Sequence, residues 1–286
     1  MLAPRHVIFT ALEGALLDSS SGLWEPATEA LEEIERQHVP LVLVTRWTRA
    51  QIEPLRRKIG HAYPFITENG GGLFIPDGYF PTHLEGAVRA GRYFCVSFGR
   101  PYSEAVEALE EIAAESSCSV MGYAQMTARE IAQNTGQSAK EAELDRQREF
   151  SERFYFAGES ADAVKRFTEI ALERKWRLTP GEPFWEIAAA KDQDGNEVGR
   201  AVRYLMRLYR TSTRTRLSSV GIGALVQDLP LLAAMDHSIL LPIRKGEFSP
   251  ELTSRLPRAM AGEAAGPLGW NTALLRMLKN SDLERQ

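Results

Sequence analysis

The sequence has only two cysteines, Cys95 and Cys118, and neither lies in a C-x-x-C or similar metal-binding spacing. This scarcity argues against a disulfide scaffold and favours two reduced thiols. Long hydrophobic runs are also missing. The apolar run at residues 7–10 is too short for a signal peptide, and no stretch approaches the roughly 18 apolar residues that span a bilayer. We therefore expect a cytoplasmic protein that makes no membrane contact.

A surplus of positive charge is the third feature that the chain lacks. Its 34 Lys and Arg residues stand against 38 Asp and Glu residues, which gives a net charge of −4. A general nucleic-acid-binding protein is usually basic, so we expect no nucleic-acid partner. The hydrophobic content of 44% and charged content of 25% are typical of a globular protein, and 286 residues suffice for two domains or for one domain with a large insertion.

Apolar strands and amphipathic helices alternate through the first part of the chain. The pattern predicts strands at residues 6–10, 39–44 and 65–67, and helices at 26–37 and 49–59. Pro54 interrupts the second helix, where a proline removes a backbone hydrogen bond. The pattern resumes near the end, with helices at 199–209, 228–235 and 268–278, a strand at 217–222 and a final strand at 238–241. Continuous apolar strands between helices predict a parallel sheet covered on both faces.

The middle of the chain has a different pattern. It predicts strands at 92–98, 118–123, 154–157 and 176–179, and helices at 102–115, 127–148 and 161–175. Thr127 and Glu130 form a predicted capping box at the start of the second of these helices. We therefore predict an α/β protein with a doubly wound parallel-sheet core at residues 1–82 and 188–286, and an inserted α+β cap domain at residues 83–187.

The segment from His6 to Asp18 carries the first motif. Its apolar run ends in a turn that contains glycine, and it resembles the first motif of the haloacid dehalogenase superfamily of phosphotransferases, D-x-D-G-T-L-L-D. Ala11 stands where that superfamily has the aspartate that attacks phosphorus. Glu13 stands at the second aspartate and Ala15 at the threonine. The resemblance implies a haloacid dehalogenase-like fold that lacks its nucleophile.

Further blocks resemble one family of that superfamily, mannosyl-3-phosphoglycerate phosphatase. They lie at residues 66–71, 126–136, 148–154 and 266–271, in both the core and the insertion. The family resemblance implies a cap inserted between the second and third motifs, dependence on Mg²⁺, and release of phosphate from a mannosylated phosphoglycerate. It also makes Asn69, Arg148 and Ser151 candidates for ligand binding.

The second and third motifs are altered. Thr45 matches the phosphate-binding hydroxyl of the family, and Arg46 beside it is a candidate anion donor. Trp47 is an alternative: its side chain would plug the pocket. Val198 stands where the resemblance places a lysine, and we assign no catalytic role to the nearby Lys191 and Arg200, which are out of register.

The fourth motif and the cap motif depart further from the family. Ala224 replaces the metal-binding aspartate and Gln227 replaces an asparagine, so Asp228 is the one remaining, weak metal candidate. We expect no bound metal or cofactor, because Asp228 with Glu13 is a poor Mg²⁺ site, and we favour Asp228 as the cap of the helix that follows. In the cap motif, Pro183 and Glu186 replace an arginine and a histidine that would meet an anionic substrate.

The changed positions share one property. Their new side chains are all apolar: Ala11, Ala15, Val198 and Ala224. Clustered carboxylates repel one another unless a metal or protons offset their charge, so these replacements favour the metal-free fold. Our first hypothesis is a catalytically silent relative that binds a protein partner or a phosphorylated metabolite.

Two alternatives stay open. One is an active Mg²⁺-dependent sugar-phosphate phosphatase that uses relocated groups, with Glu13 and Asp228 at its centre. The other is a small-molecule sensor whose cap closes on a sugar or an acid.

Overall fold

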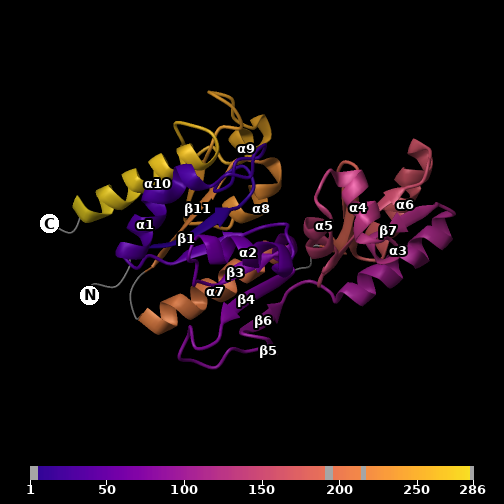
Figure 1. Cartoon of the computed structure of the whole chain (residues 1–286), viewed down its shortest axis with the longest axis horizontal. Coiled ribbons are helices and arrows are strands. Elements are labelled where there is room, and N and C mark those ends of the chain that lie inside the picture. Colours follow the sequence, from indigo (N-terminus) through magenta and orange to yellow (C-terminus); the bar gives the residue numbers. More distant parts are fainter. Residues whose placement is uncertain (1–5, 191–195, 214–216, 284–286) are drawn as a thin grey trace.

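The computed structural model describes residues 6–190, 196–213 and 217–283, which form a larger and a smaller lobe (Figure 1). A nine-stranded sheet organises the larger lobe. From one edge to the other its strands are β13 (Met260–Ala261), β12 (His237–Leu240), β11 (Ser218–Gly223), β1 (His6–Ala11), β2 (Leu41–Val44), β3 (Phe65–Thr67), β4 (Gly72–Pro76), β6 (Tyr93–Ser97) and β5 (Ala87–Ala90). The strands from β13 to β3 pair in parallel, and β4, β6 and β5 extend the sheet with antiparallel pairs.

Helices cover both faces of this sheet. They are α1 (Thr28–Arg36), α2 (Arg49–Lys58), α7 (Glu197–Thr213), α8 (Leu229–Leu232), α9 (Pro250–Arg255) and α10 (Gly266–Leu283). Phe9 of β1 lies opposite Gly221 of β11, and Gly221 faces Met235, just after α8. The next residue, Thr10, bonds to Trp270 of α10. Because successive side chains of a strand point to opposite faces, α8 and α10 cover opposite faces of the sheet.

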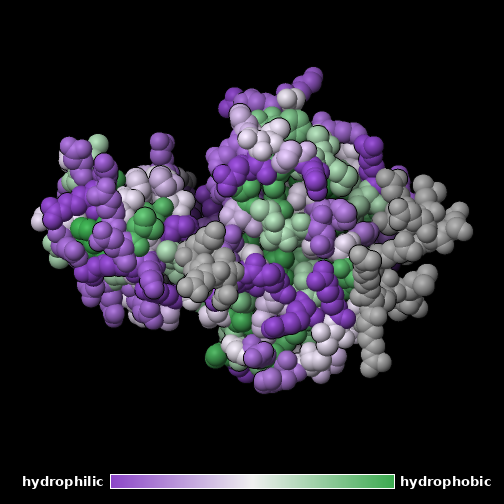
Figure 2. Space-filling model, turned by 180° about the vertical axis from the view of Figure 1, so that it is seen from behind, coloured by the Kyte–Doolittle hydropathy of each residue, from purple (hydrophilic) through white to green (hydrophobic). Residues whose placement is uncertain are grey.

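The smaller lobe has a four-stranded antiparallel sheet, in the order β7 (Val120–Gly122), β8 (Ser151–Phe156), β10 (Trp185–Ala189) and β9 (Trp176–Thr179). Its helices are α3 (Tyr102–Ser116), α4 (Ala128–Thr135), α5 (Ala139–Arg146) and α6 (Ala161–Glu173). Phe154 of β8 and Phe167 of α6 are fully buried, with ring centroids 5.7 Å apart, in a core separate from that of the larger lobe. On the face seen in Figure 2 this lobe is mostly hydrophilic, whereas hydrophobic residues show between hydrophilic ones across the larger lobe.

The predicted α/β class, with a haloacid dehalogenase-like core and an inserted cap, is confirmed. The capping box of Thr127 and Glu130 is also confirmed. No helix among the described residues is both long and apolar enough to cross a membrane.

Several predicted elements need correction. The helix predicted at 127–148 is two helices, because Gly136 ends α4 in the left-handed conformation with a φ of 73°. The strand predicted as the last is followed by β13. Residues 87–97, assigned to the insertion, form β5 and β6 of the larger sheet. Their place depends on pairing with β4, which local sequence patterns do not show.

Candidate functional site

A small cavity lies where β1, β2 and β11 end. Its lining residues are Ala11, Glu13, Val44, Thr45, Arg46, Asn69, Val198, Gln227, Asp228 and Leu231. The fold therefore brings residues from all four sequence motifs to one place. The cavity has a volume of about 20 Å³, which holds roughly one water molecule. Ala15 and Ala224, the other two altered motif positions, are buried outside this lining.

Glu13 contacts protein groups with both carboxylate oxygens, through a hydrogen bond at Oε2 and through an ion pair without a hydrogen bond at Oε1. The Thr45 hydroxyl donates a hydrogen bond to Oε2 of Glu13 over 3.0 Å. The Nε atom of Arg46 lies 3.4 Å from Oε1 of Glu13. The hydroxyl of Thr45 also accepts a hydrogen bond from the backbone N–H of Trp47. Thr45 and Arg46 thus both contact Glu13, and all three residues line the cavity.

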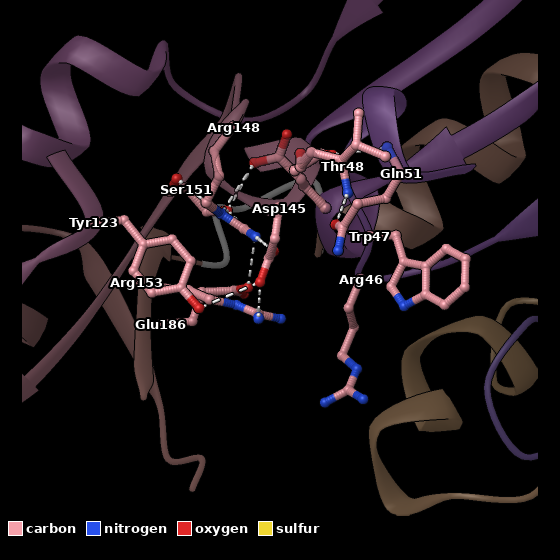
Figure 3. A network of polar contacts seen from close by, with 12 residues as sticks. Arg46, Trp47, Thr48, Gln51, Tyr123, Asp145, Arg148, Ser151, Arg153 and Glu186 are labelled. Carbon is pink, nitrogen blue, oxygen red and sulfur yellow. Dashed lines mark hydrogen bonds and ion pairs between the residues drawn. The ribbon is translucent and has the colours of Figure 1, made fainter. Parts of the chain in front are cut away.

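Trp47 does not fill this cavity. Its side chain packs against the core of the larger lobe and is not among the lining residues in the described part of the chain. Arg46 and Trp47 extend in different directions from their loop (Figure 3). The alternative in which Trp47 plugs the pocket is therefore wrong.

Asp228 fastens the loop that precedes it. Its Oδ2 atom accepts hydrogen bonds from the backbone N–H groups of Ala224 at 2.9 Å and Leu225 at 2.8 Å. The prediction that Asp228 caps the following helix is wrong, since its side chain makes no such bond to α8. Burial raises the pKa of Asp228 to about 7, and the nearby charge of Glu13 adds to the increase while that of Arg46 opposes it.

The donor groups present do not fit a Mg²⁺ ion. Mg²⁺ requires near-octahedral oxygen ligands, usually with one or two carboxylates. One oxygen of Glu13 and one of Asp228 accept hydrogen bonds from protein groups, Oε1 of Glu13 has only its ion pair with Arg46, and Ala224 offers no ligand. Within the described ranges, no group of three or more His, Cys, Asp or Glu side chains is placed to hold a metal.

The lysine position is apolar in space as well as in sequence. Val198 lies in the first turn of α7, is 7% exposed and lines the cavity. Arg200 instead places its guanidinium over the ring of Phe98, 5.5 Å from the ring centroid, and donates a hydrogen bond to the backbone carbonyl of Phe98. Lys191 lies outside the described residues. The described part of the cavity wall therefore has Arg46, already paired with Glu13, as its one cation.

A larger cleft of about 280 Å³ adjoins the cavity and reaches into the smaller lobe. It is lined by Arg46, Asn69, Thr135, Gln137, Arg153, Thr179, Pro180, Gly181, Glu182, Pro183, Phe184 and Glu186. Arg46 and Asn69 line both hollows. The sequence motifs indicated Pro183 and Glu186 here. Thr135 and Arg153 lie within the family blocks at 126–136 and 148–154 but were not predicted to bind a ligand, and Gln137 lies outside the blocks.

Arg148 and Ser151 lie beside this cleft in a buried network that joins the two lobes (Figure 3). Arg148 donates hydrogen bonds to Asp145 at 3.1 Å, to the Ser151 hydroxyl at 2.7 Å and to Glu186 at 3.0 Å. The Ser151 hydroxyl donates to Glu68 of the larger lobe at 2.8 Å. We call these residues, with Asn69 and Arg153, the joint network. Its polar groups bind one another, so Arg148 and Ser151 hold the cap to the core.

Glu68 is the residue of the joint network that anchors the cap segment to the larger lobe. Its carboxylate accepts hydrogen bonds from the backbone N–H groups of Glu149 and Phe150 as well as from Ser151. Glu68 and Asn69 both have positive φ, 46° and 54°, an uncommon conformation for residues other than glycine. The sequence block at residues 66–71 marked this loop, but its anchoring role became visible only in three dimensions.

The proteins that the chain resembles in sequence are named phosphatases. The chain is 30% identical to a glucosyl-3-phosphoglycerate/mannosyl-3-phosphoglycerate phosphatase of Methanococcoides burtonii, over 98% of this chain and 100% of the relative. It is also 30% identical to the protein of the same name from Persephonella marina, over 98% of each chain. A mannosyl-3-phosphoglycerate phosphatase of Pyrococcus furiosus is 28% identical over 87% of this chain and 96% of the relative. No family model matches the chain.

Solved structures agree with this fold. A haloacid dehalogenase-like hydrolase from Bacteroides thetaiotaomicron superposes with a TM-score of 0.66 at 16% identity, over 96% of this chain and 100% of that one. A Thermoplasma acidophilum protein superposes with a TM-score of 0.65 at 14% identity, over 96% and 98% of the two chains. At these identities the likeness concerns the fold alone.

Proposed function

We propose that this chain, which belongs to the glucosyl-3-phosphoglycerate/mannosyl-3-phosphoglycerate phosphatase family, is a catalytically silent member of it. It binds a ligand or a protein partner and does not hydrolyse a phosphate ester. The observation that carries this proposal is the small cavity at the four motifs. It accommodates roughly one water molecule, whereas a phosphoryl group has four heavy atoms.

The chemistry of the cavity supports the same proposal. Phosphoryl transfer through a covalent intermediate needs a side chain with a lone pair in line with phosphorus, and Ala11 has none. The transferred group also needs cations to neutralise its oxygens. Among the described residues of the wall, Arg46 is already paired with Glu13. The parts that the reaction requires are therefore replaced or engaged.

One observation favours a second candidate, an active phosphatase with relocated groups. Because burial raises the pKa of Asp228 to about 7, this carboxyl group is partly protonated near neutral pH, as a general acid must be. Glu13 would then serve as the nucleophile. This candidate requires Glu13 to leave Thr45 and Arg46, and it requires the cavity to open.

Phosphate release distinguishes the two candidates. We would measure release from glucosyl-3-phosphoglycerate, mannosyl-3-phosphoglycerate and p-nitrophenyl phosphate, with and without Mg²⁺. We expect no release above the uncatalysed rate from the native sequence, and none from Asp228→Asn or Glu13→Gln. Mg²⁺-dependent release by the native sequence that both substitutions abolish would overturn the silent function and establish the second candidate.

A further inference from the structure

A carboxylate forms part of the wall of the cleft between the lobes. Glu186, on β10 of the cap, lines the cleft, and its side chain is 8% exposed. Its Oε1 atom accepts a hydrogen bond from the side-chain amide of Asn69 at 2.8 Å, and its Oε2 atom accepts one from Arg148 at 3.0 Å. Glu186 thus binds one donor from the core and one from the cap, as an anionic ligand between the lobes would.

Glu186 is charged in this position. Burial by itself would raise its pKa, but the positive charges of Arg148, Arg153 and Arg177 outweigh that effect, and the pKa lies below its ordinary value. Charge-assisted hydrogen bonds of this kind are the stronger ones in proteins. An external anion would have to displace this carboxylate before it could bind Arg148.

The two arginines that line the cleft are paired with carboxylates of the protein. Arg177, which is not part of the lining, donates a hydrogen bond to the Thr179 hydroxyl. Arg153 donates a hydrogen bond to Asp145 at 2.8 Å, and Arg46 lies 3.4 Å from Glu13. The wall adds a second carboxylate, Glu182. An anion entering the described cleft therefore meets two carboxylates and no arginine without an acidic partner. Like charges disfavour such binding, most strongly where water is excluded.

Neutral hydrogen-bonding groups complete the lining. Gln137 presents a side-chain amide whose Oε1 atom accepts no hydrogen bond from the described residues. The Thr135 hydroxyl donates to the Ile131 carbonyl and the Thr179 hydroxyl accepts from Arg177, so each keeps part of its hydrogen-bonding capacity for a ligand. Carboxylates such as Glu182 and Glu186 accept hydrogen bonds from the hydroxyl groups of a sugar. The cleft volume of about 280 Å³ lies just below the roughly 300 Å³ at which small-molecule sites begin, so it suits a ligand of monosaccharide size.

We propose that Glu186 is an internal anion that fills the site between Asn69 and Arg148, and that the cleft accepts a neutral, hydroxyl-rich ligand such as a simple glycoside in place of a phosphorylated or carboxylated one. This inference rests on the proposed function, because it names the ligand class of the same silent site.

Calorimetry with neutral and anionic probes tests the proposal. The neutral probes are methyl α-mannopyranoside and methyl α-glucopyranoside, and the anionic probes are D-glycerate and inorganic phosphate. For the native chain we expect the affinity for at least one neutral probe to exceed that for either anion by about tenfold or more. Glu186→Gln keeps the shape of the side chain but removes its charge, so it should strengthen anion binding by about tenfold.

Glu149→Gln is the matched control. It weakens a different contact between the lobes, the ion pair of Glu149 with Arg49 at 3.1 Å, and Glu149 does not line the cleft. The ratio of its affinities for the neutral and the anionic probes should equal that of the native chain. Equal gains in anion binding by Glu186→Gln and Glu149→Gln would overturn the role of Glu186, because loosening of the joint would then explain both. If Glu186→Gln does not fold, the preference of the native chain alone decides.

Native protein that binds phosphate or D-glycerate more tightly than both glycosides, or that binds neither glycoside, would overturn the inference. The phosphate-release assay is independent of these measurements. Turnover together with a preference for neutral probes would remove the silent function and keep the ligand class. Absence of turnover together with a preference for anionic probes would keep the silent function and remove the proposed ligand class.

Discussion

Trp270, in the last helix, donates the N–H of its indole ring to the hydroxyl of Thr10, the residue directly before Ala11, over 2.8 Å. Both side chains are fully buried, although they are 260 positions apart in the chain. The neighbouring Asn271 accepts a hydrogen bond from the backbone of Ala30 at 2.8 Å. Two residues of the C-terminal sequence block thus tie α10 to the centre of the sheet and to α1, which is a structural role.

Removal of either partner of the Trp270–Thr10 bond should destabilise the protein. We expect Trp270→Phe and Thr10→Val each to lower the free energy of unfolding by about 1–3 kcal/mol. Thr10→Val should cost more, because it leaves the buried indole N–H without this acceptor, whereas in Trp270→Phe the Thr10 hydroxyl keeps its hydrogen bond to the Ala11 carbonyl at 2.9 Å. The double variant should lose less than the sum of the two losses, by about 1 kcal/mol, since the same bond is removed twice. Urea denaturation measures all four proteins, and strictly additive losses would show that the bond contributes nothing.

Asp228 should make stability depend on pH. Its pKa is about 7 in the folded protein and 3.8 as its ordinary value, so between these values the folded state holds a proton that the unfolded state has lost. The stability that this group contributes is therefore present below about pH 4 and is lost as the pH rises to about 7. Asp228→Asn removes the effect. Its free energy of unfolding, minus that of the native chain, should rise over this range by on the order of 2–4 kcal/mol. A flat difference in urea titrations would contradict this expectation.

His61 should act in the opposite direction. Burial, with help from the charge of Arg56, lowers the pKa of His61 to about 3 from its ordinary 6.5. The ring is neutral in the folded state, where Nδ1 accepts a hydrogen bond from Arg56 and Nε2 bonds to the Leu41 carbonyl. Its stability contribution is present above about pH 6.5 and is lost as the pH falls towards 3. In His61→Asn, the free energy of unfolding should no longer contain this decrease between about pH 6.5 and 3.

The two groups offset each other between about pH 4 and 6.5. The native chain should therefore show a shallower pH dependence in this range than either single variant, and the two variants should have slopes of opposite sign. Equal slopes in Asp228→Asn and His61→Asn would show that other groups control the dependence.

Gly70 should tolerate no side chain. It has a φ of +97°, and a Cβ atom would lie 2.3 Å from the backbone nitrogen of Val198 in the first turn of α7. We expect Gly70→Ala to lower the free energy of unfolding by about 3 kcal/mol or more. Gly78 is the matched control, with a φ of +76° and open space around it, so Gly78→Ala should lower stability by about 1 kcal/mol. Equal losses in thermal or urea unfolding would show that the contact with α7 is not the cause.

Restoring the two lost aspartates should create a response to Mg²⁺. The double variant Ala11→Asp with Ala224→Asp places charge beside Glu13 and Asp228, so without metal it should be less stable than the native chain by about 3–5 kcal/mol. Mg²⁺ should raise its melting temperature by mass action. The control with asparagine at both positions should not respond. A rise in the melting temperature of the native chain with Mg²⁺ would contradict our conclusion that its donor groups do not fit the ion.

Most of the core could be predicted because its strands are continuous apolar runs. The ranges predicted for β3 and β9 match the structure, and those for β1 and β2 differ by one or two residues. The interior strands β4 and β10 were missed because each follows a turn rich in glycine or proline. The strands β5 and β13 were missed as well. Both are edge strands with partly or fully exposed residues, and β13 has only two, so pairing with a neighbour defines them more than composition does.

The site could be predicted only in part, for a related reason. Motif positions located the cavity, since strand ends gather at one edge of a parallel sheet. They could not show that Glu186 bonds to Asn69, 117 positions away, or that Arg148 faces three carboxylates. Those contacts depend on how the cap sits on the core.

The small volume of the cavity also has a consequence for the evolution of the chain. The motif positions Ala11, Val198 and Ala224 are buried in the hydrophobic core of the larger lobe, beside a cavity with room for about one water molecule. A single reversion at Ala11, Val198 or Ala224 would insert a charge there without the others that offset it, and would lower stability. Under the proposed silent function, a return to activity would therefore pass through less stable intermediates or need several changes at once.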